Sequence, residues 1–188
     1  MANKKTAIIL LFILIFLSTA CMINVGGPDY PVSSIPVSTD ALATLESQIQ
    51  TAIVSSDQTG QMTVFITETQ LTSYLANKFG SQENPFITRP QAYLQNGQIQ
   101  IYGTVTKGYF SATVSMLMTA SIDPEGKLVL ELSAADFGPF PVPETIKEMT
   151  SSIITEAYTG LLGPIATGFR LDSIIISYGA MMLIGKLK

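Results

Sequence analysis

Histidine and tryptophan are absent from this chain of 188 residues, and it contains one cysteine. Without histidine, a Ser-His-Asp or Cys-His catalytic arrangement and an imidazole metal site are excluded. A single cysteine excludes an intrachain disulfide, a thiolate zinc site and an iron–sulfur cluster. Charged residues make up only 13% of the chain, and the 10 basic residues are scattered among 14 acidic ones. Such a chain offers no basic patch for nucleic acid.

The acidic residues do not indicate an active site. Asp123 and Glu125 flank a proline in a turn, and Glu144, Glu148 and Glu156 lie on the polar side of a predicted helix. Solvated charges that compensate a helix dipole explain these positions better than an acid–base pair. A calcium site would need more convergent carboxylates. We therefore expect no enzymatic activity, no catalytic or metal-binding residue and no cofactor.

The N-terminal residues have the pattern of an export signal. Lys4 and Lys5 form a basic start, residues 7–17 form an apolar run, and small residues at 18–20 precede Cys21. This order is typical of a secretory signal peptide, here residues 1–20. The position of Cys21 resembles the acylated cysteine of a bacterial lipoprotein. We expect an exported protein, lipidated at Cys21 and anchored to the outer side of the cytoplasmic membrane.

Two alternatives to lipidation remain open. Residues 7–25 are long enough to span a membrane as an uncleaved anchor, or cleavage after Ala20 releases a free protein. The rest of the chain is exported in each case. Loss of residues 1–20 removes two lysines and no acid, so the net charge falls from −4 to −6.

The exported part divides into two regions. Residues 21–37 are rich in proline, glycine and serine and lack periodicity, which predicts an extended tether that holds the domain off the membrane. Residues 38–188 contain no repeat or low-complexity segment, and they predict one domain, large enough to bury most of its unfolded surface.

The first half of this domain reads as helix, strand, helix and hairpin. Leucine and isoleucine at helical spacing predict a helix over 40–54, and a short strand follows at 62–66. Thr67 and Gln70 form a capping box for a second helix, which ends at Gly80. Asn96-Gly97 is a favoured hairpin turn between strands.

The second half begins with the most regular alternation in the chain. Apolar side chains at every second position of 110–122 predict an antiparallel strand with one solvated face. After a turn and a further strand, Pro143 begins a helix that is expected to continue to Leu162, and a hairpin closes the chain. We predict an α+β fold in which a curved antiparallel sheet wraps around this long C-terminal helix, with the other helices N-terminal.

The order of these elements resembles a known family. The residues that carry the resemblance are TETQLTSYL (67–75), NGQIQIYGTV (96–105), DPEGKLVLEL (123–132) and FGPFPVPETI (137–146), followed by the closing hairpin. Together they resemble the LmeA-like phospholipid-binding proteins and the YceB-like bacterial lipoproteins, of the tubular lipid-binding superfamily that includes the BPI-like domains. The resemblance implies an apolar groove for acyl chains between the helix and the sheet.

The expected function is therefore non-enzymatic binding of a phospholipid or other hydrophobic ligand by a membrane-tethered domain. Methionine-rich strands suit variable apolar ligands, and large apolar pockets are the usual form of such sites. The alternative is a structural or assembly lipoprotein with a filled core that contacts other envelope proteins. The groove is predicted to be lined by Phe110, Val114, Met116, Met118, Leu130, Met149, Ile153 and Tyr158.

Overall fold

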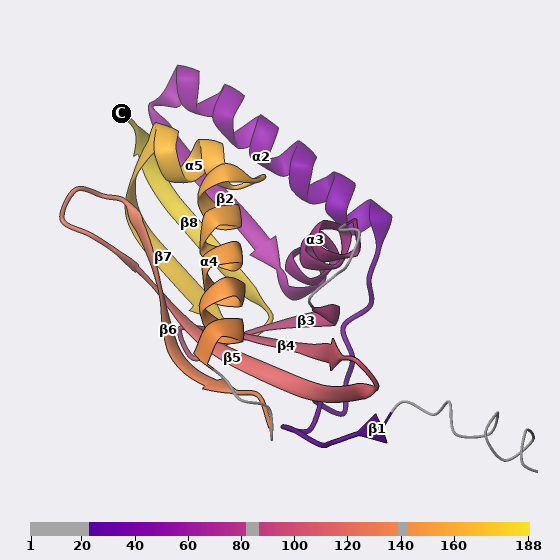
Figure 1. The fold of residues 1–188 in the computed structure, drawn as a ribbon. Coiled ribbons are helices and arrows are strands. Elements are labelled where there is room, and N and C mark those ends of the chain that lie inside the picture. The colour runs from indigo at the N-terminus through magenta and orange to yellow at the C-terminus, as the bar shows by residue number, and fades with distance from the viewer. Residues whose placement is uncertain (1–22, 82–86, 139–142) are drawn as a thin grey trace, which may run out of the picture.

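The computed structural model describes the backbone of residues 23–81, 87–138 and 143–188, and their side chains except those of 107 and 143–150. This part of the chain contains four helices and eight strands (Figure 1). The helices are α2 (Thr39–Thr59), α3 (Glu68–Gly80), α4 (Pro143–Thr159) and α5 (Gly163–Gly168). The strands are β1 (Ile23–Asn24), β2 (Gln61–Thr67), β3 (Thr88–Gln95), β4 (Gln98–Lys107), β5 (Phe110–Ile122), β6 (Leu128–Asp136), β7 (Phe169–Ser177) and β8 (Ala180–Leu187).

Local signals in the sequence account for the ends of several elements. The capping box of α3 is present: the Gln70 N–H donates to Thr67 Oγ1, and the Thr67 N–H donates to Gln70 Oε1. Asn96 and Gly97 both have positive φ, 51° and 77°, as a two-residue turn between β3 and β4 requires. Helix α2 begins at its Ser38 cap and extends past the expected end at residue 54, to Thr59.

The strands form two sheets. The larger has the order β1-β5-β4-β3, with β6 also paired to β5, and the smaller has the order β2-β8-β7. All pairs are antiparallel except β1 with β5. Three backbone hydrogen bonds join the sheets at their turns: Gly97 N–H to the Ile176 carbonyl, Gly179 N–H to that of Leu94, and Leu171 N–H to that of Gly126. The two sheets thereby curl into a half-barrel (Figure 1).

The predicted architecture is wrong in its central feature. The fold has both helices and sheets, but no single sheet wraps a long C-terminal helix. Helix α4 ends at Thr159, and a separate short helix, α5, follows it. Leu161 and Leu162 have helical spacing from α4, but α4 ends before Gly160, and α5 begins at Gly163 with Pro164 in its first turn. The closing hairpin pairs with β2 and does not extend the larger sheet.

The segment expected to be a tether lies along the domain. Ile23 and Asn24 pair with the start of β5, and the Tyr93 hydroxyl donates to the Ser33 carbonyl at 2.6 Å. Ile35 is buried among core residues. Residues 23–38 form no helix and only the two-residue strand β1, and they contact the larger sheet through β1, Ser33 and Ile35.

Candidate functional site

The predicted groove residues do not form one surface. Val114, Met116 and Met118 on β5 are each only 1% exposed and belong to the core, whereas Phe110 at the start of the same strand is 46% exposed. The half-buried Tyr158 donates its hydroxyl hydrogen to the Leu128 carbonyl. The side chain of Met149 and all of Cys21 lie outside the described residues.

An apolar cavity of about 70 Å³ lies between α3, α4 and the inner faces of both sheets. Three predicted groove residues line it: Met118, Leu130 and Ile153. The rest of its lining comes from residues that the sequence interpretation did not place there: Leu71, Tyr74, Leu75, Ile99, Ile101, Ala120, Leu128, Glu156, Ala157, Leu162, Ile174, Met181 and Leu183. The local sequence pattern does not reveal this lining, because α3, β4 and β8 come together through contacts between residues far apart in the chain.

One corner of the cavity is polar. The Tyr74 hydroxyl donates to Glu156 Oε1 and accepts a hydrogen bond from the Leu161 N–H at 3.0 Å. Lys78 Nζ lies 3.2 Å from Glu156 Oε2. Burial, followed by the hydrogen bond to Glu156, raises the pKa of Tyr74 well above its ordinary value. At neutral pH Tyr74 is therefore a protonated phenol, and its hydrogen bonds to Glu156 and Leu161, together with the Lys78–Glu156 ion pair, attach the end of α4 to α3.

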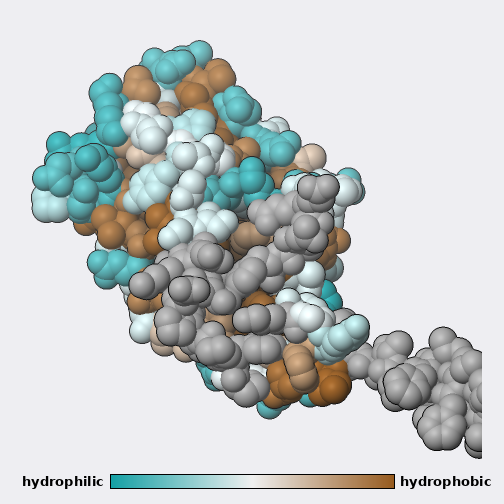
Figure 2. All heavy atoms as spheres, viewed as in Figure 1, coloured by the Kyte–Doolittle hydropathy of each residue, from teal (hydrophilic) through white to brown (hydrophobic). Residues whose placement is uncertain are grey.

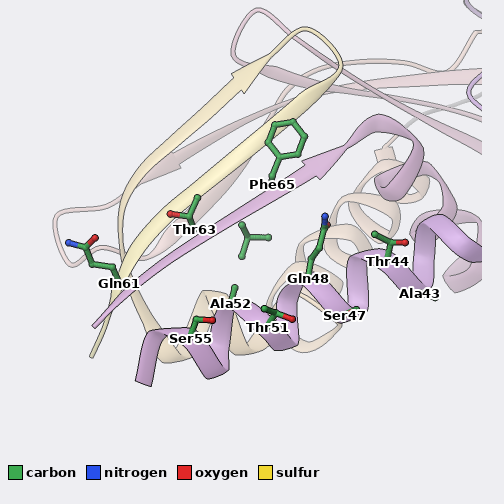
Figure 3. A pocket seen from close by; sticks show the side chains of 11 residues that line it. Ala43, Thr44, Ser47, Gln48, Thr51, Ala52, Ser55, Gln61, Thr63 and Phe65 are labelled. Carbon is green, nitrogen blue, oxygen red and sulfur yellow. The ribbon is translucent and has the colours of Figure 1, made fainter. Parts of the chain in front are cut away.

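A second, larger site is an open groove of about 650 Å³ between α2 and β2 (Figure 3). Its α2 wall carries small and polar side chains, and Gln48 points from this wall toward β2 (Figure 3). Thr63 and Phe65 rise from the strand on the other side. None of the lining residues is charged: Ala43, Thr44, Ser47, Gln48, Thr51, Ala52, Ser55, Gln61, Thr63, Val64 and Phe65.

Strand β2 forms the edge of the smaller sheet at this groove. The Glu68 N–H donates to the Gly179 carbonyl, and the Gly60 carbonyl accepts from Leu187. Because bonded positions alternate along an antiparallel pair, the even-numbered residues of β2 bond to β8. The backbone N–H and C=O groups of Thr63 and Phe65 therefore face away from β8, and neither residue has a backbone hydrogen-bond partner in the described part of the chain.

Nothing in the described ranges forms a metal centre: no group of three or more Asp, Glu or Cys side chains comes together there. Among the helices whose placement is described, none combines the length and hydropathy of a membrane span. Models of known protein families give no match to this chain, and curated proteins give none either. The resemblance to the LmeA-like and YceB-like proteins therefore stays a prediction.

Proposed function

We propose that this chain is a non-enzymatic, exported domain, anchored outside the cytoplasmic membrane, that binds the acyl chain of a phospholipid or a similar hydrophobic ligand between α4 and the two sheets. The observation that carries this proposal is the apolar cavity. Its walls come from α3, α4 and five strands, and they are aliphatic apart from the Tyr74–Glu156 corner. An apolar site with a few polar groups at one place is the usual form of a small-molecule site.

The size of the cavity defines how a ligand would enter. A cavity of about 150 Å³ holds benzene, so this cavity of about 70 Å³ accepts only a few carbon atoms. An acyl chain would need α4 to move away from β5 and β6. The polar corner at the C-terminal end of α4 would then lie beside the ligand, where Glu156 can accept a hydrogen bond from a polar head group.

Ligand uptake by the chain from residue 22 onward tests this proposal. This version keeps residues 23–37, which pack on the domain, and omits the N-terminal apolar run. Native mass spectrometry should show one lipid per chain, and a fluorescent phospholipid should bind saturably. Absence of both a co-purified lipid and saturable uptake contradicts the proposal.

Two matched substitutions on β5 test whether the ligand binds in this cavity. Ala120 lines the cavity, whereas Ala112, on the same face of the same strand, is buried elsewhere in the core. Ala120→Leu fills the cavity, so we expect weaker uptake and a change in stability below about 1 kcal/mol. Ala112→Leu overpacks the core, at a cost of about 1–3 kcal/mol, and should leave uptake unchanged. Equal uptake by both variants would show that the ligand does not bind in this cavity.

The edge of β2 favours a second candidate function, assembly through protein contacts. Edge strands are usually protected by charges, prolines or bulges, but β2, QMTVFIT, has no charge or proline, and its pairing with β8 is regular. An extended segment of another protein could add to this edge in the α2–β2 groove. The two outward-facing residues would provide its hydrogen bonds.

A photo-crosslinking side chain at Ser47, inside the groove, tests this second candidate in intact cells. A discrete crosslinked product is expected, and it should disappear in Thr63→Pro, which blocks the edge without breaking a bond to β8. The same crosslinker at Glu46, an exposed residue outside the groove, is the control. Equal products from both positions, or none from Ser47, contradict strand addition.

A further inference from the structure

The N-terminal end of the described chain is attached to the turn between β4 and β5. The Ile23 N–H donates to the Tyr109 carbonyl at 2.9 Å, and the Val25 N–H donates to the Ser111 carbonyl at 2.9 Å. The Thr113 N–H in turn donates to the Gly26 carbonyl at 3.0 Å. Gly27 then passes so close to the Thr113 backbone that a side chain there would collide with it. The chain after Ile23 is therefore fixed to this end of the larger sheet.

This end of the domain also carries exposed large side chains. Ile23 is 54% exposed, Tyr109 is 77% exposed, and Phe110, the cross-strand neighbour of Ile23, is 46% exposed. The later inward positions of β5, such as Val114 and Met116, are by contrast fully packed. Figure 2 shows hydrophobic surface at this lower end of the molecule, where β1 lies in Figure 1.

We propose that Ile23, Tyr109 and Phe110 form a docking end that inserts into the surface of the lipid bilayer. This inference rests on the N-terminal anchor of the proposed function, but it does not depend on the ligand cavity. Cys21 precedes Ile23 by two residues, so the two Cα atoms are at most about 7.6 Å apart. That reach is comparable to one interfacial layer of a bilayer, about 5–7 Å on each side of the hydrocarbon core.

The chemistry of the docking end fits this layer. Tyrosine is enriched at membrane interfaces because its ring is apolar and its hydroxyl remains hydrated. Ile23, two residues after the proposed anchor, and its cross-strand neighbour Phe110 supply exposed apolar area. The docking end would also fix the orientation of the domain. Strand β5 leads away from the membrane, and its 13 residues place the β5–β6 turn about 40 Å along the strand.

The absence of tryptophan from the chain allows a direct test with single-tryptophan variants of the full chain. Tyr109→Trp is reconstituted in phosphatidylcholine vesicles, with and without bromine on the acyl chains. Its emission should shift to shorter wavelength, and the brominated lipid should remove most of its intensity. Glu125→Trp, in the exposed β5–β6 turn, is the control, and it should emit as a hydrated indole with no quenching. Phe110→Trp serves as a second reporter should Tyr109→Trp fold poorly.

Each outcome bears on the docking end. Quenching of Tyr109→Trp or Phe110→Trp, without quenching of Glu125→Trp, supports it. Vesicle-bound protein in which neither end is quenched, or in which both ends are quenched equally, overturns it, as does a full chain that fails to sediment with vesicles. Failure of the ligand proposal is separate, since it would appear as absent lipid uptake by the chain from residue 22 onward.

Discussion

The side-chain amide of Gln91 on β3 holds the backbone of Ile35 through two hydrogen bonds. The Ile35 N–H donates to Gln91 Oε1 at 2.6 Å, and Gln91 Nε2 donates to the Ile35 carbonyl at 3.0 Å. Both residues are 9% exposed. An amide can donate and accept at once, so Gln91 forms hydrogen bonds with both the N–H and the C=O of Ile35, which belongs to no strand. Residues 28–37 thereby become part of the folded domain.

Gln91→Leu should destabilise the protein by about 2–4 kcal/mol, because it leaves a buried N–H and a buried C=O without partners. Denaturant titration of the chain from residue 22 onward measures this change. Gln95→Leu is the control: its side chain is half-buried and makes one weak contact with Gln100, at 3.3 Å, so a change within about 0.5 kcal/mol is expected. Equal effects of the two variants would show that the Ile35 segment is held by other contacts.

Met116→Ala should cost about 2–5 kcal/mol, as is typical for truncation of a buried methionine, and should leave lipid uptake unchanged. Met116 is 1% exposed and does not line the cavity. Phe110→Ala, at the exposed end of the same strand, should change stability by no more than about 0.5 kcal/mol. If Met116→Ala kept its stability but took up less lipid, Met116 would have to contact the ligand.

Tyr74→Phe should reduce stability and flatten its dependence on alkaline pH. The pKa of Tyr74 is raised in the folded state by burial and by Glu156. The folded protein therefore holds this proton more tightly than the unfolded chain does. The resulting stabilisation is fully present below pH 10.0, the ordinary value for tyrosine, and is lost as the pH rises above it.

The measurement for Tyr74→Phe is a series of denaturant titrations from neutral to strongly alkaline pH. Loss of the hydroxyl removes the acceptor of the Leu161 N–H, so a cost of about 1–3 kcal/mol at neutral pH is expected. Tyr178→Phe, on an exposed residue, should behave as wild type. If the free energy of unfolding depended on pH in the same way for wild type and Tyr74→Phe, the loss of stability at alkaline pH would come from other groups.

Cys21→Ser should leave the domain folded and move it from the membrane fraction to a soluble or precursor form. One acyl chain gives only marginal attachment, so stable anchoring depends on the several chains of a bacterial lipoprotein. Fractionation of cells that produce each form measures the change. Full retention of Cys21→Ser in the membrane would identify residues 7–25 as an uncleaved anchor.

Local structure could be predicted where a few neighbouring residues determine it. Thr67 and Gln70 specify the start of α3, and Asn96-Gly97 specifies a turn that few other residue pairs allow. The length of α4 was predicted wrongly because Leu161 and Leu162 continue its apolar stripe past Gly160. The pairing of strands could not be predicted for a different reason: no residue near Met181 indicates that its strand, β8, pairs with β2 at Ile66.

The candidate site was predicted only in part for a related reason. Alternation along β5 identifies the inward face, and Met118 indeed faces the cavity. The same pattern cannot tell Met118 from Met116, which the surrounding side chains enclose completely. Which part of an inward face is filled depends on α3, α4 and β8, and their arrangement follows from contacts between distant residues.

The pairing of β2 with β8 has a consequence for folding of the newly made chain. Gln61 pairs with Lys186, and Thr67 with Ala180, so the first strand of the smaller sheet has its neighbour only at the end of the chain. Contacts this distant in sequence form slowly. Until β8 is available, both edges of the uncharged segment QMTVFIT are unpaired, and such segments are prone to aggregate. Formation of the β7–β8 hairpin therefore ends the period in which the newly made chain is most prone to aggregate.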